Sequence, residues 1–130
     1  MTREELKAAA VAMLDRAYGP YSHLPVGAAL ECDDGTVFTG CNVENAAYGS
    51  TICAERTALV KAVSEGHKDF AAIAIAGRGG DYCWPCGACR QMLYEFAPEL
   101  AVLVARGDGG FVKLPLKELL PHGFGPSSLD

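Results

Sequence analysis

Two short cysteine motifs constrain the fold of this chain more than any other feature of its sequence. Cys-Ala-Glu occupies residues 53–55 and Pro-Cys-Gly-Ala-Cys occupies residues 85–89, and each motif begins a segment that is predicted to be helical. Cys86 and Cys89 are three residues apart on a helix, so their side chains lie close together and can bind one ion. If Cys53 is a third ligand, two helix N-termini must meet at one metal, where their dipoles stabilise thiolates.

A site with three cysteine ligands leaves one position of a tetrahedral zinc ion open. Catalytic zinc sites keep three protein ligands and leave the fourth position to water, whereas structural sites close all four with cysteine or histidine. Glu55 is not needed as a ligand, and a carboxylate beside such a water can move its protons. Residues i and i+2 of a regular helix do not share a face. Cys53 and Glu55 therefore both reach the site only if Cys53 lies in the non-helical turn that enters the helix.

Two arginines follow the motifs directly. Arg56 follows the glutamate and Arg90 follows the third cysteine. A zinc ion with three thiolates has a net negative charge, which makes its water less acidic than the water of a three-histidine site. We expect either arginine to donate hydrogen bonds to the sulfurs and so offset this charge.

The composition is typical of one folded domain with a small-molecule partner. The chain has 130 residues, of which 50% are hydrophobic, which suffices for one core, and we expect residues 1–130 to form a single domain. The net charge of −5, without a run of lysine or arginine, argues against nucleic acid as a partner.

The sequence also favours a soluble, cytoplasmic protein. Residues 1–10 are rich in charge and lack an apolar signal segment, and no stretch approaches the roughly 20 apolar residues of a membrane span. Six cysteines without a secretory signal are typical of metal-binding, buried or catalytic residues in a reducing compartment, and not of a disulfide framework.

Hydrophobic spacing and turn residues predict the order of helices and strands. A helix, a β-hairpin and then alternating helices and strands indicate an α/β fold, a three-layer α-β-α sandwich around a mixed sheet of about five strands. We expect Ser50 or Thr51 to be the N-cap of the second helix. The predicted helices are Arg3–Tyr18, Thr51–Glu65, Cys86–Phe96 and Pro115–Leu120; the predicted strands are Val26–Cys32, Val37–Val43, Phe70–Ala76, Leu100–Ala105 and Phe111–Leu114; residues 107–110 are a predicted turn, and the tail from Pro121 is a predicted loop.

Cys-Ala-Glu followed by Pro-Cys-Gly-Ala-Cys-Arg-Gln resembles the small zinc-dependent cytidine deaminases. The resemblance extends over nearly the whole chain, with further matches at residues 20–23, 26–28, 40–45, 55–58, 119–121 and 124–125. It implies a cytidine-deaminase-like fold in which Cys53, Cys86 and Cys89 hold one zinc ion per subunit.

The reaction that this resemblance implies is the hydrolytic deamination of cytidine and deoxycytidine to uridine and deoxyuridine, with release of ammonia, in pyrimidine salvage. A water activated by zinc attacks C4 of the cytosine ring. Glu55 takes a proton from that water, protonates N3 and then delivers a proton to the departing amino group.

The resemblance also implies which residues bind the nucleoside. Asn42 and Glu44 are assigned to the ribose hydroxyls, and backbone groups near Ala54 to the base. Phe124 contributes to the pocket, commonly across a subunit boundary of a homotetramer. Leu24 stands where an aromatic residue is common, and it can pack against a base but cannot stack as a π-system.

The residues leave several alternative functions, and an alternative metal, open. Trp84 stands where a small residue is common, so an aminonucleoside-antibiotic deaminase is a second possible enzyme. Cys83 and the three other cysteines can form a closed site in a non-catalytic zinc module. A nucleic-acid editing deaminase shares the chemistry but conflicts with the acidic charge. Iron also binds thiolates, although four-coordinate cysteine sites suit zinc.

Overall fold

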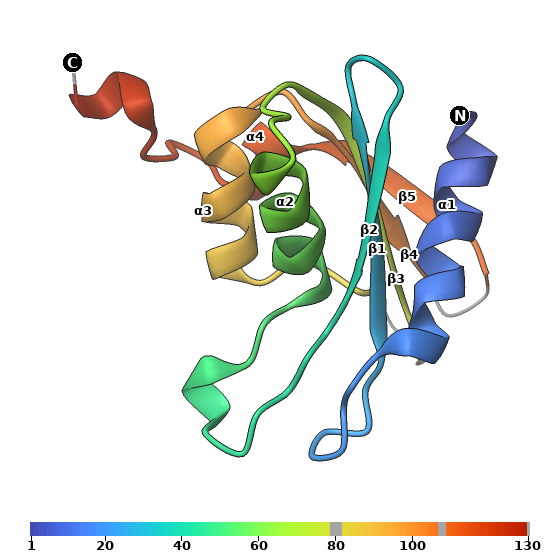
Figure 1. Cartoon of the computed structure of the whole chain (residues 1–130). Helices are drawn as coiled ribbons and strands as arrows, with labels where there is room; N and C mark the ends of the chain where they lie inside the picture. Colours follow the sequence, from blue (N-terminus) through green and yellow to red (C-terminus); the bar gives the residue numbers. More distant parts are fainter. Residues whose placement is uncertain (79–81, 107–108, 130) are drawn as a thin grey trace.

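The computed structural model describes residues 1–78, 82–106 and 109–129, and its centre is a mixed five-stranded sheet (Figure 1). The strand order is β2-β1-β3-β4-β5. β3 and β4 are parallel, while all other neighbours are antiparallel. The predicted mixed sheet is therefore confirmed. The strands are β1 (Val26–Cys32), β2 (Val37–Cys41), β3 (Phe70–Gly77), β4 (Ala101–Ala105) and β5 (Phe111–Pro115).

Helices cover both faces of this sheet, which confirms the predicted α-β-α sandwich. α1 (Arg3–Ala12) lies on one face, and α2 (Ala54–Ser64) and α3 (Gly87–Phe96) lie side by side on the other (Figure 1). The short α4 (Leu116–Leu119) packs beside α3. The N-termini of α2 and α3 are thus brought to the same side of the sheet.

The two faces of β3 carry side chains of different size. Ile73 and Ile75 are fully buried in the core that includes α2 and α3, whereas the alanines at positions 72, 74 and 76 belong to the core beneath α1. Successive side chains of a strand point to opposite faces. Burial on both faces explains why the sequence here is a continuous apolar run instead of an alternating one.

Two helix boundaries differ from the prediction by more than one residue. α1 ends at Ala12 and continues as a 3-10 turn over Met13–Arg16, so the predicted helix to Tyr18 is too long. α2 begins at Ala54, and its N-cap is Cys53 instead of Ser50 or Thr51. The reason for the second difference is a pair of backbone hydrogen bonds between Val43 and Ile52, 2.9 and 3.0 Å long, which hold the preceding segment extended.

The C-terminal tail contains more structure than the predicted loop. Pro126–Leu129 forms a 3-10 helix that stands away from the sheet and its helices (Figure 1). The predicted turn at 107–110 falls partly on residues outside the described ranges. Within the described ranges no helix has the length and apolar character to cross a membrane.

Candidate active site

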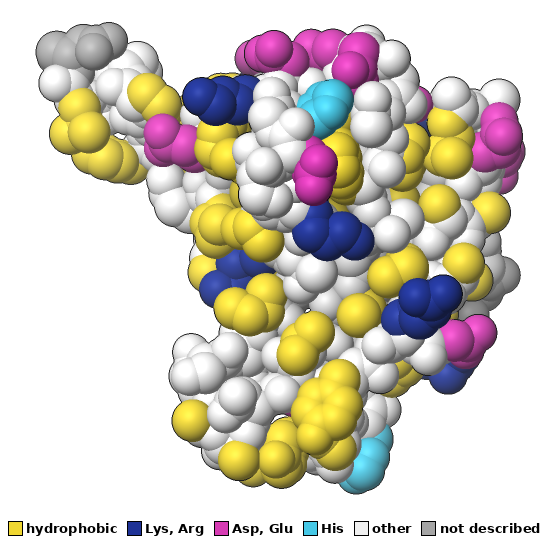
Figure 2. Space-filling view, viewed as in Figure 1, with side chains coloured by type: hydrophobic (Ala, Val, Ile, Leu, Met, Phe, Trp, Pro, Cys, Tyr) yellow, Lys and Arg dark blue, Asp and Glu magenta, His cyan; other side chains and the backbone are white. Residues whose placement is uncertain are grey.

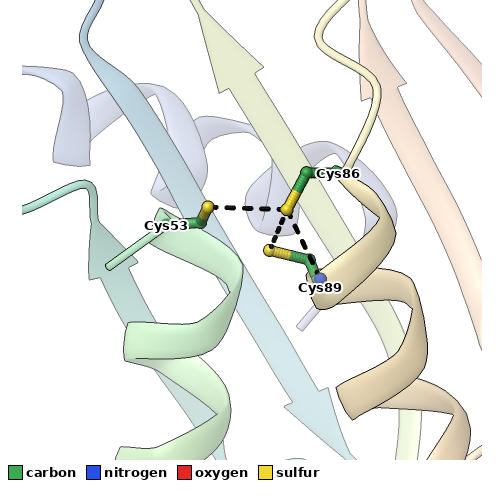
Figure 3. A group of neighbouring side chains, drawn as sticks. All are labelled: Cys53, Cys86 and Cys89. Atoms are coloured by element: carbon green, nitrogen blue, oxygen red, sulfur yellow. Dashed lines mark hydrogen bonds between the residues drawn. The ribbon is translucent and has the colours of Figure 1, made fainter. Parts of the chain in front are cut away.

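Three cysteine sulfurs from two helix starts meet at one point (Figure 3). The Sγ atoms of Cys53 and Cys86 are 3.7 Å apart, and those of Cys86 and Cys89 are 3.3 Å apart. All three sulfurs lie within 4.8 Å of one another. Sulfur atoms this close suit the coordination of a single ion.

Local backbone geometry explains why the sulfurs converge. Cys53 and Cys86 are the N-caps of α2 and α3, and both have extended backbone angles (φ −72°, ψ 155° and φ −69°, ψ 168°). An N-cap side chain points back across the first helical turn, and Sγ of Cys86 accepts a hydrogen bond from the backbone N–H of Cys89. Since Cys53 precedes the first helical residue, Glu55 can share its side of the helix.

Hydrogen bonds stabilise a thiolate at Cys53. The Cys89 thiol and the Arg56 guanidinium donate to its sulfur, and together with Cys86 they lower the pKa of Cys53 to about 5 against the opposing effect of burial. The pKa of Cys89 is raised instead, first because its proton is held in the bond to Cys53. A thiolate is the form of cysteine that binds metals.

Arg56 lies beside the sulfur cluster. Its Nη2 donates to Sγ of Cys53 at 3.4 Å and to the backbone oxygen of Thr51 at 3.3 Å. Its Nε is buried and has no hydrogen-bond partner within the described residues. An arginine that bonds one of the sulfurs and keeps a further donor unused fits a site that gains negative charge when all three sulfurs are ionised, as zinc coordination requires.

Glu55 is a buried carboxyl group next to the sulfurs. Only 4% of the residue is exposed, and burial, with a smaller contribution from the charge of Cys53, raises its pKa to about 6. Glutamate with a pKa near neutrality can both accept and donate protons at physiological pH.

Cys53, Cys86 and Glu55 line a pocket of about 210 Å³, whereas the fully buried Cys89 is not among its lining residues. Asn42 and Ala54, which the sequence predicted to contact substrate, also line it. Sequence reasoning placed neither Val26 nor Thr51 in the site and left the role of Trp84 open, yet these three line the same pocket. The place of Thr51 in the site could have been predicted from the sequence. It precedes Cys53 by two residues on an extended segment, where alternate side chains point to the same side.

Cys83 lines the same pocket, but its sulfur is not a member of the cluster of three. Burial and the charge of Glu55 raise the pKa of Cys83 to about 11, so it remains a neutral thiol. Among the described residues, the closed four-cysteine arrangement is therefore not formed.

Asn42 and Glu44 hold the loop that precedes β1. Asn42 accepts a hydrogen bond from Val26 N at 2.8 Å and donates to Leu24 O at 3.1 Å. The Glu44 carboxylate accepts from the backbone N–H groups at Tyr21 and Ser22 and from the Ser22 hydroxyl. Glu44 lies in an adjacent hollow of about 260 Å³, with Tyr21, Ser22, Tyr48 and Thr51. Thr51 lines both hollows, so the two are neighbours.

Three other predicted site residues lie elsewhere. Leu24 and Phe124 are exposed and are not among the residues that line the pocket. The donors of Arg90 bond to the backbone oxygens of Pro85 and Leu119, both at 2.8 Å, and not to a sulfur within the described residues. Arg90 thus fixes the start of α3 against α4, which contradicts the expectation that it bonds the sulfurs directly.

The comparisons with known proteins agree with this geometry. Residues 1–105 match the model of the cytidine and deoxycytidylate deaminase zinc-binding region. A cytidine deaminase of Halalkalibacterium halodurans is 46% identical, with 95% of both chains covered. The crystal structure of a cytidine deaminase from Burkholderia pseudomallei superposes with a TM-score of 0.91 at 47% identity and covers 95% of this chain and 100% of that one.

A more distant relative is a deaminase whose name gives a different substrate. A blasticidin-S deaminase of Bacillus cereus is 34% identical over 104 residues, which cover 74% of each chain. The family model covers most of the chain, and two of these relatives cover nearly all of it. The chain therefore belongs to the zinc-binding cytidine and deoxycytidylate deaminase family.

Proposed function

We propose that this protein is a zinc-dependent cytidine deaminase, which converts cytidine and deoxycytidine with water into uridine and deoxyuridine plus ammonia. The observation that carries the proposal is the buried Glu55 carboxyl in one pocket with Cys53 and Cys86, two of the three cysteines whose sulfurs cluster. Residues 1–130 form one domain in this proposal.

In the proposed site, Cys53, Cys86 and Cys89 hold one zinc ion. Zinc with three protein ligands activates a water molecule for attack on C4 of the pyrimidine. Arg56 donates to the Cys53 sulfur and offsets part of the negative charge of the thiolates. Arg90 acts more remotely, since it positions the first turn of α3, from which Cys86 and Cys89 extend.

Glu55 moves the protons of the reaction. Its carboxylate accepts one proton from the attacking water and passes it to N3 of the ring. It then takes the second proton of that water, whose oxygen is now bonded to C4, and delivers it to the leaving amino group. Burial keeps this carboxyl from bulk water and holds its pKa near 6. The group can thus be ionised before the reaction and protonated during it.

The two adjacent hollows accommodate the two parts of a nucleoside. The pocket beside the sulfurs takes the base, whose polar edge meets the backbone N–H groups at the start of α2 near Ala54, which lack intrahelical partners. Asn42 and Glu44 face the ribose, and Thr51 marks the passage between the hollows. Leu24 packs against the nucleoside from the loop that Asn42 holds.

A homotetramer completes the site in this proposal. Phe124 is 57% exposed, and its backbone oxygen accepts a hydrogen bond of 2.7 Å from the Gln91 side chain on α3. The 3-10 helix that follows it stands away from the sheet (Figure 1). An exposed aromatic side chain next to a projecting segment is well placed to enter the pocket of a neighbouring subunit. The pocket of an isolated chain then lacks one apolar wall.

Pyrimidine salvage in the cytoplasm is the role that we propose. The six cysteines are free thiols, three of them in the proposed zinc site, and a reducing compartment preserves them. A small nucleoside as substrate agrees with the net charge of −5, which disfavours polyanionic nucleic acid.

A second function, deamination of an aminonucleoside antibiotic, is favoured by two observations. The Bacillus cereus relative is a blasticidin-S deaminase, and Trp84 adds a large indole to the pocket wall. Turnover of cytidine and of blasticidin S by the same preparation separates the two functions.

The experiment that tests the main proposal follows cytidine turnover by ultraviolet absorbance, with wild-type protein and Glu55→Gln, and measures zinc in both. We expect turnover to fall by about 10²- to 10⁴-fold in Glu55→Gln, with zinc retained. A wild-type protein that holds zinc but leaves cytidine and deoxycytidine unchanged would overturn the proposal.

A further inference from the structure

A second group of metal-binding side chains lies beyond the opposite end of α2 from Cys53. The sulfur of Cys32, a carboxylate oxygen of Asp34 and a ring nitrogen of His67 all lie within 4.8 Å of one another. Nδ1 of His67 is 3.7 Å from Oδ2 of Asp34. α2 has 11 residues and so spans about 16 Å, which separates this group from the sulfur cluster.

Two backbone turns hold these side chains together. Cys32 ends β1 at an irregularity in its pairing with β3, and such irregularities redirect side chains. A hydrogen bond of 2.9 Å from Asp33 N to Asp69 O ties the β1–β2 turn to the loop after α2. His67 follows Gly66, whose φ of +94° reverses the chain at the end of the helix.

The side chains of Asp34 and His67 are held in place by contacts outside the group. Oδ1 of Asp34 accepts a hydrogen bond of 2.9 Å from Thr36 N, which leaves Oδ2 for His67 and a further ligand. The His67 ring packs edge-on against Phe38, with ring centroids 5.1 Å apart. Both donors are therefore oriented before any ion binds.

The three donors line a pocket of about 170 Å³ in acidic surroundings. Asp33 and Asp69 line it as well, and Lys68 is the cation among its lining residues. Figure 2 shows acidic and histidine side chains near the end of the molecule where the β1–β2 turn lies in Figure 1. The local charge thus favours a cation over an anion.

We propose that Cys32, Asp34 and His67 form a second metal site, which binds a divalent transition metal with the chemistry of zinc. One thiolate, one imidazole and one carboxylate are all ligands that zinc accepts, and three protein ligands leave a fourth position for water. The ion joins the β1–β2 turn to the C-terminal end of α2. It stabilises the fold and takes no part in the deamination.

The test is a titration of protein that already holds one equivalent of zinc with Co²⁺, under reducing conditions. Wild-type protein is expected to bind one further equivalent and to develop thiolate-to-cobalt absorption, with its original zinc content unchanged. His67→Phe keeps the ring contact with Phe38 and Asp34→Asn keeps the bond to Thr36, yet each removes a ligand. Both variants are expected to bind Co²⁺ at least about 10-fold more weakly.

Cys41→Ala is the matched control for Cys32→Ala, because Cys41 is a free cysteine on the neighbouring strand outside the group. The absorption should disappear in Cys32→Ala and persist in Cys41→Ala. The proposal is overturned if wild-type protein binds no further equivalent, or if His67→Phe and Asp34→Asn bind it as tightly as the wild type. Cytidine turnover is expected to be unchanged in His67→Phe, so this result does not depend on the proposed deaminase activity.

Discussion

Arg56 donates a hydrogen bond of 3.4 Å from Nη2 to the sulfur of Cys53. The same nitrogen bonds to the backbone oxygen of Thr51, at the passage between the two hollows. The bond to Cys53 is also the main cause that raises the pKa of the guanidinium. One arginine therefore links the charge of a proposed zinc ligand to the wall of the proposed nucleoside site.

Arg56→Gln removes this charge and is expected to lower kcat by about 10- to 100-fold while most of the zinc is retained. Without the positive charge of Arg56, the negative charge of the three thiolates is less offset. Water bound to the metal is then less acidic. Steady-state kinetics and zinc analysis on the same preparation check the prediction. Unchanged kinetics would show that the guanidinium charge has no effect on the reaction.

Arg90→Ala has a different expected effect, because Arg90 bonds backbone oxygens of Pro85 and Leu119. Loss of two hydrogen bonds from a charged donor is expected to lower the free energy of unfolding by about 2 kcal/mol. Urea unfolding of the zinc-loaded protein measures this change. Arg16→Ala provides a comparison at an exposed arginine on the 3-10 turn that follows α1. A variant with wild-type stability and low activity would indicate a direct catalytic effect instead.

The sequence was sufficient to predict the sheet and the proximity of Cys86 to Cys89 for physical reasons, whereas the place of Cys53 beside them followed from the family resemblance. The apolar run of β3 has the length of one strand. A continuous apolar run is typical of a strand whose two faces are both buried, so it predicts a strand inside the sheet. Cys86 and Cys89 are close because the side chain of an N-cap residue lies over the first helical turn, three residues along. These features depend on local periodicity, which a single sequence contains.

The start of α2 and the role of Arg90 could not be predicted in the same way. Ile52 is held extended by Val43, a partner nine residues earlier in the chain, so local propensity placed the N-cap too early. Arg90 reaches Leu119, which lies 29 residues later. Both features depend on tertiary contacts, and periodicity carries no information about them.

Gly40→Ala is expected to disturb the packing of β2 against α2. A Cβ atom at Gly40 would lie 2.5 Å from Ala54 O and 2.6 Å from Ala58 N, so the start of α2 must move. We expect a loss of about 1–3 kcal/mol in the free energy of unfolding, together with weaker zinc binding, since Cys53 caps this helix. Gly49→Ala is the control, because nothing lies within 4 Å of its added Cβ. Equal stability of the two variants would contradict the prediction.

Trp84→Ser tests whether the indole contacts the base. Trp84 lines the pocket, and stacking on an aromatic side chain contributes about 1–3 kcal/mol for each base. The KM for cytidine is therefore expected to rise by about 10-fold, with little change in kcat. Tyr82 packs against Trp84 but does not line this pocket, so Tyr82→Ser is the matched control. A lower KM in Trp84→Ser would show that the indole obstructs the nucleoside.

Glu55 is expected to destabilise the fold at neutral pH when zinc has been removed with a chelator. Burial raises its pKa from 4.5 to about 6, so folding favours the protonated carboxyl. Above about pH 6, the ionised carboxylate lowers the free energy of unfolding by about 2 kcal/mol. This loss of stability disappears as the pH falls towards 4.5.

Glu55→Gln removes this ionisation, so the chelated variant is expected to be about 2 kcal/mol more stable than the wild type at pH 7.5. The difference should shrink as the pH falls through 6 and vanish below about pH 4, because the wild-type carboxyl is protonated in both states only below its unfolded pKa of 4.5. Urea unfolding at several pH values, with reductant present, measures it. Glu65→Gln changes the same charge at an exposed helix end and should show no such pH dependence. If chelated Glu55→Gln were no more stable than the wild type at pH 7.5, burial of the ionised carboxylate would not oppose folding.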